Sequence, residues 1–168
     1  MAISMYQVSV PVFLKTLGNL AAILDKGAAY AAAKKVDPSV LLRYRLAPDM
    51  LDLTRQVQLA TDHAKRGTAR IAGVEAPAYE DNEATFAELK ARIDKTIAFV
   101  NSVKPAQIDG SETREITLKL GATSKTLTGQ TYLLHSALPN FFFHVTTAYD
   151  ILRHCGVEIG KSDFIGQI

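Results

Sequence analysis

The chain has 168 residues, of which 48% are hydrophobic and 21% charged, a balance typical of one globular domain and not of a disordered or membrane-spanning protein. Its 19 basic and 17 acidic residues form no run of like charge, which argues against nucleic acid as a partner. The single cysteine, Cys155, excludes internal disulfides and paired-cysteine metal motifs. We expect residues 1–168 to form one cytoplasmic domain, because we recognise no signal peptide and no apolar span of about 20 residues.

The first helix is predicted from Met5 to about Lys35, where apolar residues recur at helical spacing. Pro11 lacks a backbone donor, so either the helix begins near it or its first turn is bent. The stretch 37–39, Asp-Pro-Ser, then breaks the pattern.

A second helix is expected after a connector at 40–46 that contains at most one helical turn. Ala47-Pro48-Asp49 is a suitable helix start, and Gly73 is a suitable stop after Ala72. A loop with Pro77 follows.

The third helix begins with a capping box at Thr85-Phe86-Ala87-Glu88, and Pro105 follows its end. The period then changes, because apolar and polar residues alternate over 115–120 and a turn at 121–123 leads into 125–128. We predict a small two-stranded hairpin laid across the end of the helices.

The fourth helix is expected from Gly129 to Gly156, a length of roughly 40 Å at about 1.5 Å per residue. Pro139 should kink or locally break it. The last twelve residues, 157–168, suggest an extended tail. The predicted fold is therefore all-α, an antiparallel four-helix bundle with a small β-hairpin between helices three and four.

Three segments resemble a known bacterial family of unknown function. They are LPNFFFHVTTAYDILRHCG at 138–156, RLAPDM at 45–50 and EDNE at 80–83. The chain is similar over nearly its whole length to domain of unknown function 1993, in the DinB/YfiT-like superfamily of metalloenzymes. This resemblance implies the same bundle.

The resemblance also implies where a metal would bind. Relatives that hold Zn²⁺ or Ni²⁺ carry one histidine on helix two and a His-xxx-His pair on a later helix. The matching positions here are His63, Asn140 and His144. An amide oxygen is a poor ligand for these metals compared with imidazole, so we expect no bound metal.

Helical geometry places His144 and Asn140 on one face of the fourth helix, pointing into the bundle. His135 and His154 cannot reach this position. His63 lies about 90° from the apolar stripe of its helix, which predicts a partly exposed flank residue. It shares its face with Asp52, Gln56, Gly67 and Arg70.

Three functions remain open. The first is a divergent metal-dependent enzyme of the thiol transferase or hydrolase type that uses His63 and His144, with Asn140 as a weak third ligand. The second, which we prefer, is a metal-free bundle that binds a small apolar ligand in an interior pocket oriented by Asn140 and His144.

The third function is a purely structural or partner-binding role, most simply as a homodimer. Phe141, Phe142 and Phe143 point in three directions around the fourth helix, so at least one aromatic ring leaves the core. We expect a homodimer through this helix whichever activity exists.

Overall fold

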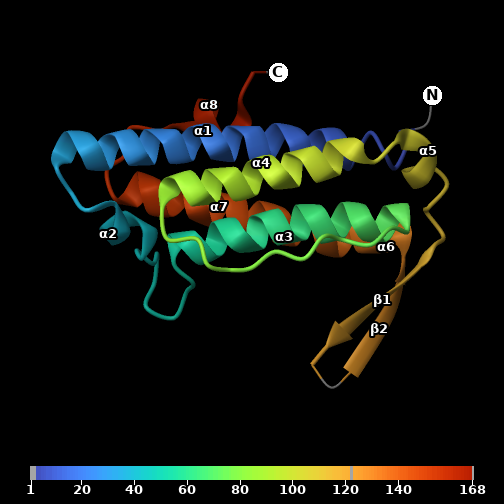
Figure 1. Cartoon of the computed structure of the whole chain (residues 1–168). Coiled ribbons are helices and arrows are strands. Elements are labelled where there is room, and N and C mark those ends of the chain that lie inside the picture. The colour runs from blue at the N-terminus through green and yellow to red at the C-terminus, as the bar shows by residue number, and fades with distance from the viewer. Residues whose placement is uncertain (1–2, 122, 168) are drawn as a thin grey trace.

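Four long helices form a bundle in the computed structural model, which describes residues 3–121 and 123–167 (Figure 1). Three of them are single α-helices: α1 (Val10–Lys34), α3 (Leu53–Ala72) and α4 (Phe86–Ser102). The fourth is a continuous run of α6 (Gly129–Tyr132), a π-helical turn (Leu133–Ala137) and α7 (Leu138–His154). The predicted four-helix bundle is confirmed.

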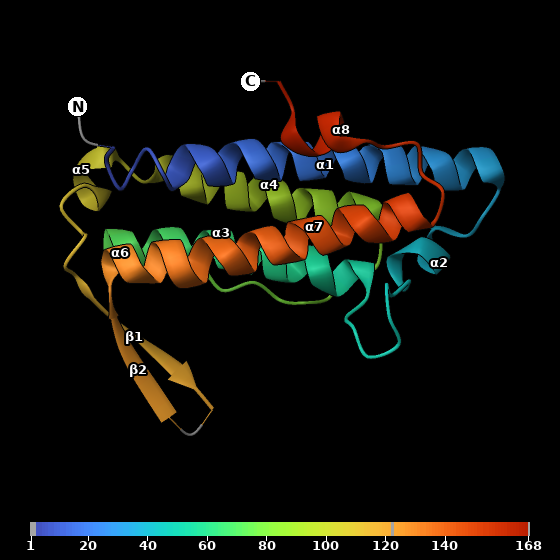
Figure 2. The ribbon, with the colours of Figure 1, turned by 180° about the vertical axis from the view of Figure 1, so that it is seen from behind.

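The most closely packed helix pairs are α3 with α7 and α1 with α4, and both pairs are antiparallel (Figures 1 and 2). The long segment 73–85 runs back along the bundle, so α3 and α4 have the same direction (Figure 1). The core between the helices is mainly apolar. Its largest fully buried side chains include Phe13, Leu20, Ile71, Ile93 and Phe141.

The start of α3 differs from the prediction. The helix begins at Leu53 because the carboxylate of Asp52 accepts a hydrogen bond from the backbone N–H of Arg55. The residues around Pro48 form a turn instead, which the Arg45 guanidinium closes by donating to the carbonyl of Met50 over 2.8 Å.

Three shorter helices complete the fold: α2 (Pro38–Leu42), α5 (Pro105–Ile108) and α8 (Lys161–Ile165). The helix α2 overlaps the predicted connector at 40–46 only in part, because it begins at Pro38 within the expected break, where Asp37 caps it by accepting from the backbone N–H of Ser39. The predicted extended tail is wrong over α8, where Asp163 accepts from the backbone N–H of Gly160 and pairs with Lys26 of α1 at 2.7 Å.

The hairpin consists of β1 (Glu115–Leu120) and β2 (Thr123–Thr128), paired antiparallel from Glu115 opposite Thr128 to Leu120 opposite Thr123. Of the predicted turn, Ala122 lies outside the described residues. The hairpin does not lie across the bundle end but projects away from it (Figures 1 and 2). Ile116 at its base is buried, whereas most strand residues further out are exposed.

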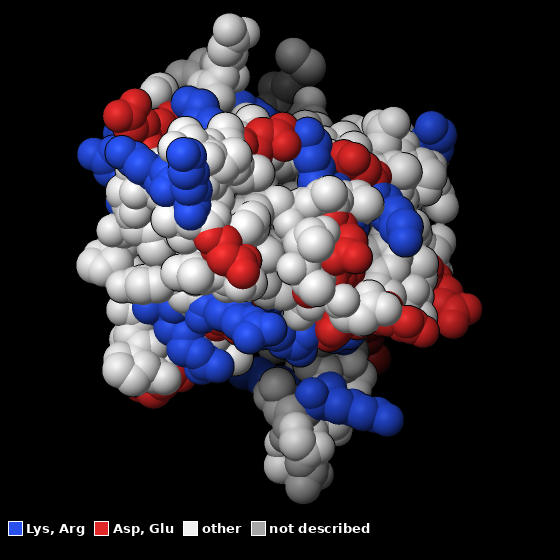
Figure 3. All heavy atoms as spheres, turned by 60° about the vertical axis from the view of Figure 1, so that its left-hand side comes forward, with Lys and Arg blue, Asp and Glu red and all other residues white. Residues whose placement is uncertain are grey.

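Acidic and basic side chains are interspersed on the face of the molecule that Figure 3 shows. This agrees with the scattered charges of the sequence. Within the described part of the chain, no helix has the combination of length and apolar character that crossing a membrane requires.

Candidate functional site

The candidate site lies where α3 and α7 face each other, around His63 and His144. The two imidazole rings stack with their centroids 5.3 Å apart and their planes inclined by 15°. His144 is buried, with 9% of its surface exposed, and His63 is partly exposed. His63 lies on the flank of the apolar stripe of α3, as predicted, and this side of α3 faces α7.

Gln56 fixes the orientation of the His144 ring. The amide nitrogen of Gln56 donates to the backbone carbonyl of Leu51 over 3.1 Å, so its Oε1 faces Nδ1 of His144 at 2.7 Å. Because an amide oxygen can only accept, Nδ1 of His144 carries the hydrogen. Nε2 is then the unprotonated nitrogen and presents a lone pair.

Both imidazoles are held in the neutral form. Burial is the main cause that lowers the pKa of His63 to about 4, and the neighbouring His144, Arg66 and Arg70 lower it further against the opposing effect of Asp62. Burial also lowers the pKa of His144, with a smaller effect from Arg55. At neutral pH the pair is therefore uncharged in surroundings that disfavour added positive charge.

Asn140 does not point into the bundle. Its side chain is exposed, and its amide nitrogen donates to the carbonyl of Ser136 over 2.7 Å. The physical reason is that the buried stripe of α7 is centred near Phe141 and Ala148 and not on His144. At about 100° per residue Asn140 lies roughly 80° from that centre, and its amide satisfies a carbonyl of the π-helical turn before it.

The remaining histidines lie elsewhere, as expected. His135 is exposed within the π-helical turn. His154 is exposed at the end of α7, where its ring lies 5.6 Å from that of Tyr44.

The comparisons with known proteins agree with this architecture. Residues 5–165 match the model of a family described as domain of unknown function (DUF1993). The chain belongs to the DUF1993 family.

A crystal structure of a DinB family member protein from Shewanella denitrificans is 43% identical to this DUF1993 chain. The match covers 97% of this chain and 92% of that one, with a TM-score of 0.89. No curated protein matches the chain. The resemblance drawn from the segments at 45–50, 80–83 and 138–156 is therefore confirmed.

The residues of this DUF1993 chain do not fit a three-ligand metal centre. The lone pairs of imidazoles lie in the ring planes, and near-parallel stacking of His63 and His144 does not converge them on one ion. The third position, Asn140, offers an exposed amide. Among residues 3–121 and 123–167, no group of three or more His, Cys, Asp or Glu side chains is placed to hold a metal.

A second polar cluster lies on the opposite side of α3, around the buried Arg92 of α4. The Arg92 guanidinium donates to Thr61 at 2.7 Å, to Asp62 at 3.0 Å and to Glu83 at 3.1 Å. It also pairs with Asp81 at 3.0 Å. All three of its nitrogens are therefore used, and the cluster ties the segment 73–85 to α3 and α4.

The partners of Arg92 are themselves satisfied. Asp62 also binds Lys65 at 3.0 Å and Arg66 at 2.8 Å, and the ammonium of Lys65 lies 3.6 Å from the ring centroid of Tyr79. Gln58 donates to Glu83 over 2.8 Å. The EDNE segment that supported the family resemblance thus has a structural role.

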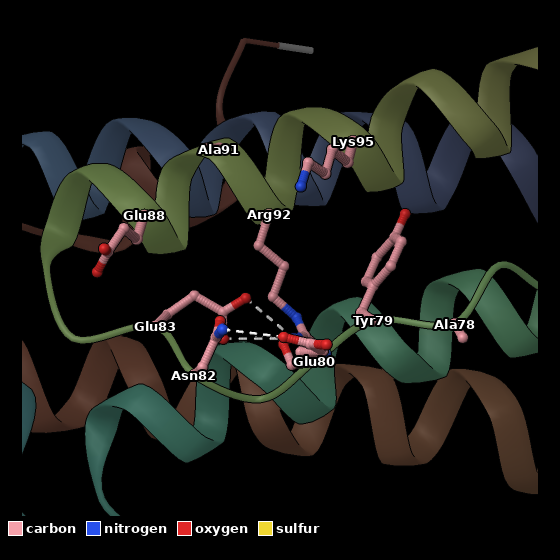
Figure 4. A pocket seen from close by; sticks show the side chains of 9 residues that line it. All are labelled: Ala78, Tyr79, Glu80, Asn82, Glu83, Glu88, Ala91, Arg92 and Lys95. Carbon is pink, nitrogen blue, oxygen red and sulfur yellow. Dashed lines mark hydrogen bonds and ion pairs between the residues drawn. The ribbon is translucent and has the colours of Figure 1, made fainter.

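A hollow of about 460 Å³ borders this cluster (Figure 4). Glu80, Glu83 and Arg92 converge on one side of it, and Tyr79 and Lys95 stand on the other. Because the charged groups of its floor already bind one another, the hollow offers a ligand few free polar groups.

Both clusters could be predicted only in part from the sequence. It placed Gln56 on the face of His63 but could not assign it a partner, since that partner lies 88 residues further along the chain. Arg92 was not predicted, because an arginine in a helix is normally expected to be exposed. Its position three residues after Leu89, on the apolar stripe, was the available signal.

Proposed function

We propose that this DUF1993 protein binds a small molecule at the imidazole pair of His63 and His144 without a metal. The observation that carries the proposal is that only one of the four ring nitrogens of the pair has a hydrogen-bond partner among the described residues. Nδ1 of His144 is fixed by Gln56, but neither its Nε2 nor either ring nitrogen of His63 has a hydrogen-bond partner among the described residues. Pre-oriented polar groups of this kind are typical of ligand sites.

The chemistry of the pair suggests the class of ligand. Nε2 of His144 can only accept a hydrogen bond, while the neutral ring of His63 has one donor and one acceptor. A hydroxyl or thiol, which both donates and accepts, matches this pattern. Leu59 precedes His63 by one helical turn and is partly exposed, so it offers an apolar contact to the rest of the ligand.

The surrounding charges favour the same class. Arg66 and Arg70 follow His63 by three and seven residues and lie on its side of α3. Arg66 is paired with Asp62, but Arg70 has no carboxylate partner among the described residues and donates to the hydroxyl of Tyr132 over 3.0 Å. Positive charge of this kind stabilises the anion of a hydroxyl or thiol and opposes a divalent cation.

The expected ligand pocket in the bundle interior is not supported. The His144 ring is surrounded by Gln56, His63 and Phe143. Hollows of about 460 and 480 Å³ lie elsewhere, beside Arg92 and beside Tyr30, and neither Asn140 nor His144 lines them. We therefore place the proposed ligand at the surface seam between α3 and α7, with the exposed Asn140 at its rim.

One observation favours the alternative of a metal-dependent enzyme using His63 and His144. Histidines that bind metals usually have their other ring nitrogen held by a hydrogen bond, as Gln56 holds Nδ1 of His144. We rank the metal-dependent enzyme second, because the third ligand position is occupied by Asn140 and the neighbouring charges are positive.

Metal content distinguishes the two functions. We expect untagged protein purified without chelator to contain well under one Zn²⁺ or Ni²⁺ per chain by plasma mass spectrometry. Because the side chain of Asn140 is exposed and the two rings do not converge, Asn140→His should raise the affinity for Zn²⁺ by less than about 10-fold over wild type in a calorimetric titration. About one metal per wild-type chain would overturn the metal-free proposal.

We also propose that the protein is a homodimer through α7. The support is Phe143, which leaves 56% of its surface exposed while Phe141, two residues earlier, is fully buried. Large exposed apolar side chains on a helix often mark an interface.

A further inference from the structure

The outer face of α7 carries a protruding aromatic side chain. Phe143 is 56% exposed, and its ring packs edge-on against His144 with the centroids 5.3 Å apart. This contact restricts the ring, so Phe143 projects from the helix as an ordered group. No element covers this face of α7, which is turned toward the viewer in Figure 2.

The same face carries a hollow one to two helical turns further along. It has a volume of about 180 Å³ and lies between α7 and α8. Its walls include Tyr149 and Phe164, whose rings meet edge to face with centroids 5.9 Å apart, and Thr146 lies at its edge nearest Phe143. An aromatic hollow of this size suits a phenyl ring, since aromatic groups prefer such edge-to-face neighbours.

A protrusion and a hollow on one face form a self-complementary surface. A two-fold axis that lies in the plane of this face, across α7 and through the midpoint between them, carries each protrusion onto the other copy's hollow. That midpoint lies near Thr146, which is exposed. The 17 residues of α7 provide about 25 Å of helix along which two copies can make further contacts.

We propose that two copies of the chain associate through α7 about a two-fold axis near Thr146, each inserting Phe143 into the other copy's hollow, against the rings of Tyr149 and Phe164. This proposal rests on the homodimer proposed above and specifies its geometry. Because Phe143 also contacts His144, the interface lies directly beside the histidine pair.

The first test compares the solution masses of wild type and Phe143→Ala by light scattering over a concentration series. We expect a wild-type dimer and a dissociation constant at least about 30-fold higher for Phe143→Ala, the effect of removing a buried aromatic anchor. Leu134→Ala is the matched control, because Leu134 is also exposed, at 41%, but lies outside the proposed contact. It should leave the dimer unchanged.

The second test uses a cysteine at the axis in a Cys155→Ser background. Residues on a two-fold axis meet their own copies, so Thr146→Cys should form an intermolecular disulfide on mild oxidation. Ala98→Cys, at an exposed position of α4, should not. A monomeric wild type would overturn the homodimer itself, whereas a dimer insensitive to Phe143→Ala, or one that Thr146→Cys does not cross-link, would overturn only this interface.

Discussion

The helix α3 contributes to two polar clusters that differ in one respect. The cluster around Arg92, on the side of α4, contains four types of charged side chain, and its charged groups have partners among the described residues. The histidine pair, on the side of α7, contains no charge at neutral pH, and three of its ring nitrogens have no partner in the part of the chain that the structure describes. A cluster whose polar groups all have partners, which we call saturated, holds the fold together. A cluster with unpartnered groups can bind a ligand.

The largest expected effect is on the saturated cluster. Arg92→Leu would remove the cation that pairs with Glu83 and one of the three that bind Asp62, and we expect a loss of about 3–5 kcal/mol in the free energy of unfolding measured in urea. The control is Lys95→Leu, an exposed position on the same helix, which should change stability by less than about 0.5 kcal/mol. A loss below about 1 kcal/mol for Arg92→Leu would contradict a structural role.

The histidine pair should make stability depend on pH. The pKa of His63 is about 4 in the folded chain and about 6.5 in the unfolded chain. Between these values only the unfolded chain takes up the proton, so the stabilisation is complete above pH 6.5 and is lost as the pH falls toward 4. Allowing for the partial exposure of His63, we expect this residue to lower the free energy of unfolding by about 2 kcal/mol between pH 6.5 and pH 4.

The measurement is urea unfolding at pH 7 and at pH 4 for wild type and His63→Gln. Other groups titrate in this range, so the informative quantity is the difference between the two proteins in their loss of stability on acidification. Wild type should lose more. Equal losses would mean that His63 is not desolvated at the seam.

Most of the fold could be predicted from the sequence, because long amphipathic patterns and the Thr85–Glu88 capping box are local signals. What the sequence missed depends on contacts between distant segments. The hairpin was predicted, but not its projection away from the bundle, and α8 was missed because it is held by Lys26 of α1.

The candidate site was predicted only in part for the same reason. His63 and His144 were both identified, but one helix alone does not determine which neighbour its flank faces. The error at Asn140 came from centring the buried face of the helix on His144, whereas the buried stripe of α7 is centred near Ala148 and leaves Asn140 at its edge. One polar residue at the edge of a stripe is therefore a poor guide to where the centre of the stripe lies.

The central claim is that His63 and His144 form a neutral pair with a free acceptor at Nε2 of His144. Long-range nitrogen–proton NMR correlation of the histidine rings tests it most directly, with His144→Gln and His63→Gln to assign the signals. We predict that at pH 7 both rings are neutral, that His144 carries its hydrogen on Nδ1, and that His63 takes up a proton only near pH 4. A hydrogen on Nε2 of His144 at pH 7, or a His63 that titrates near pH 6.5, would contradict this account of the site.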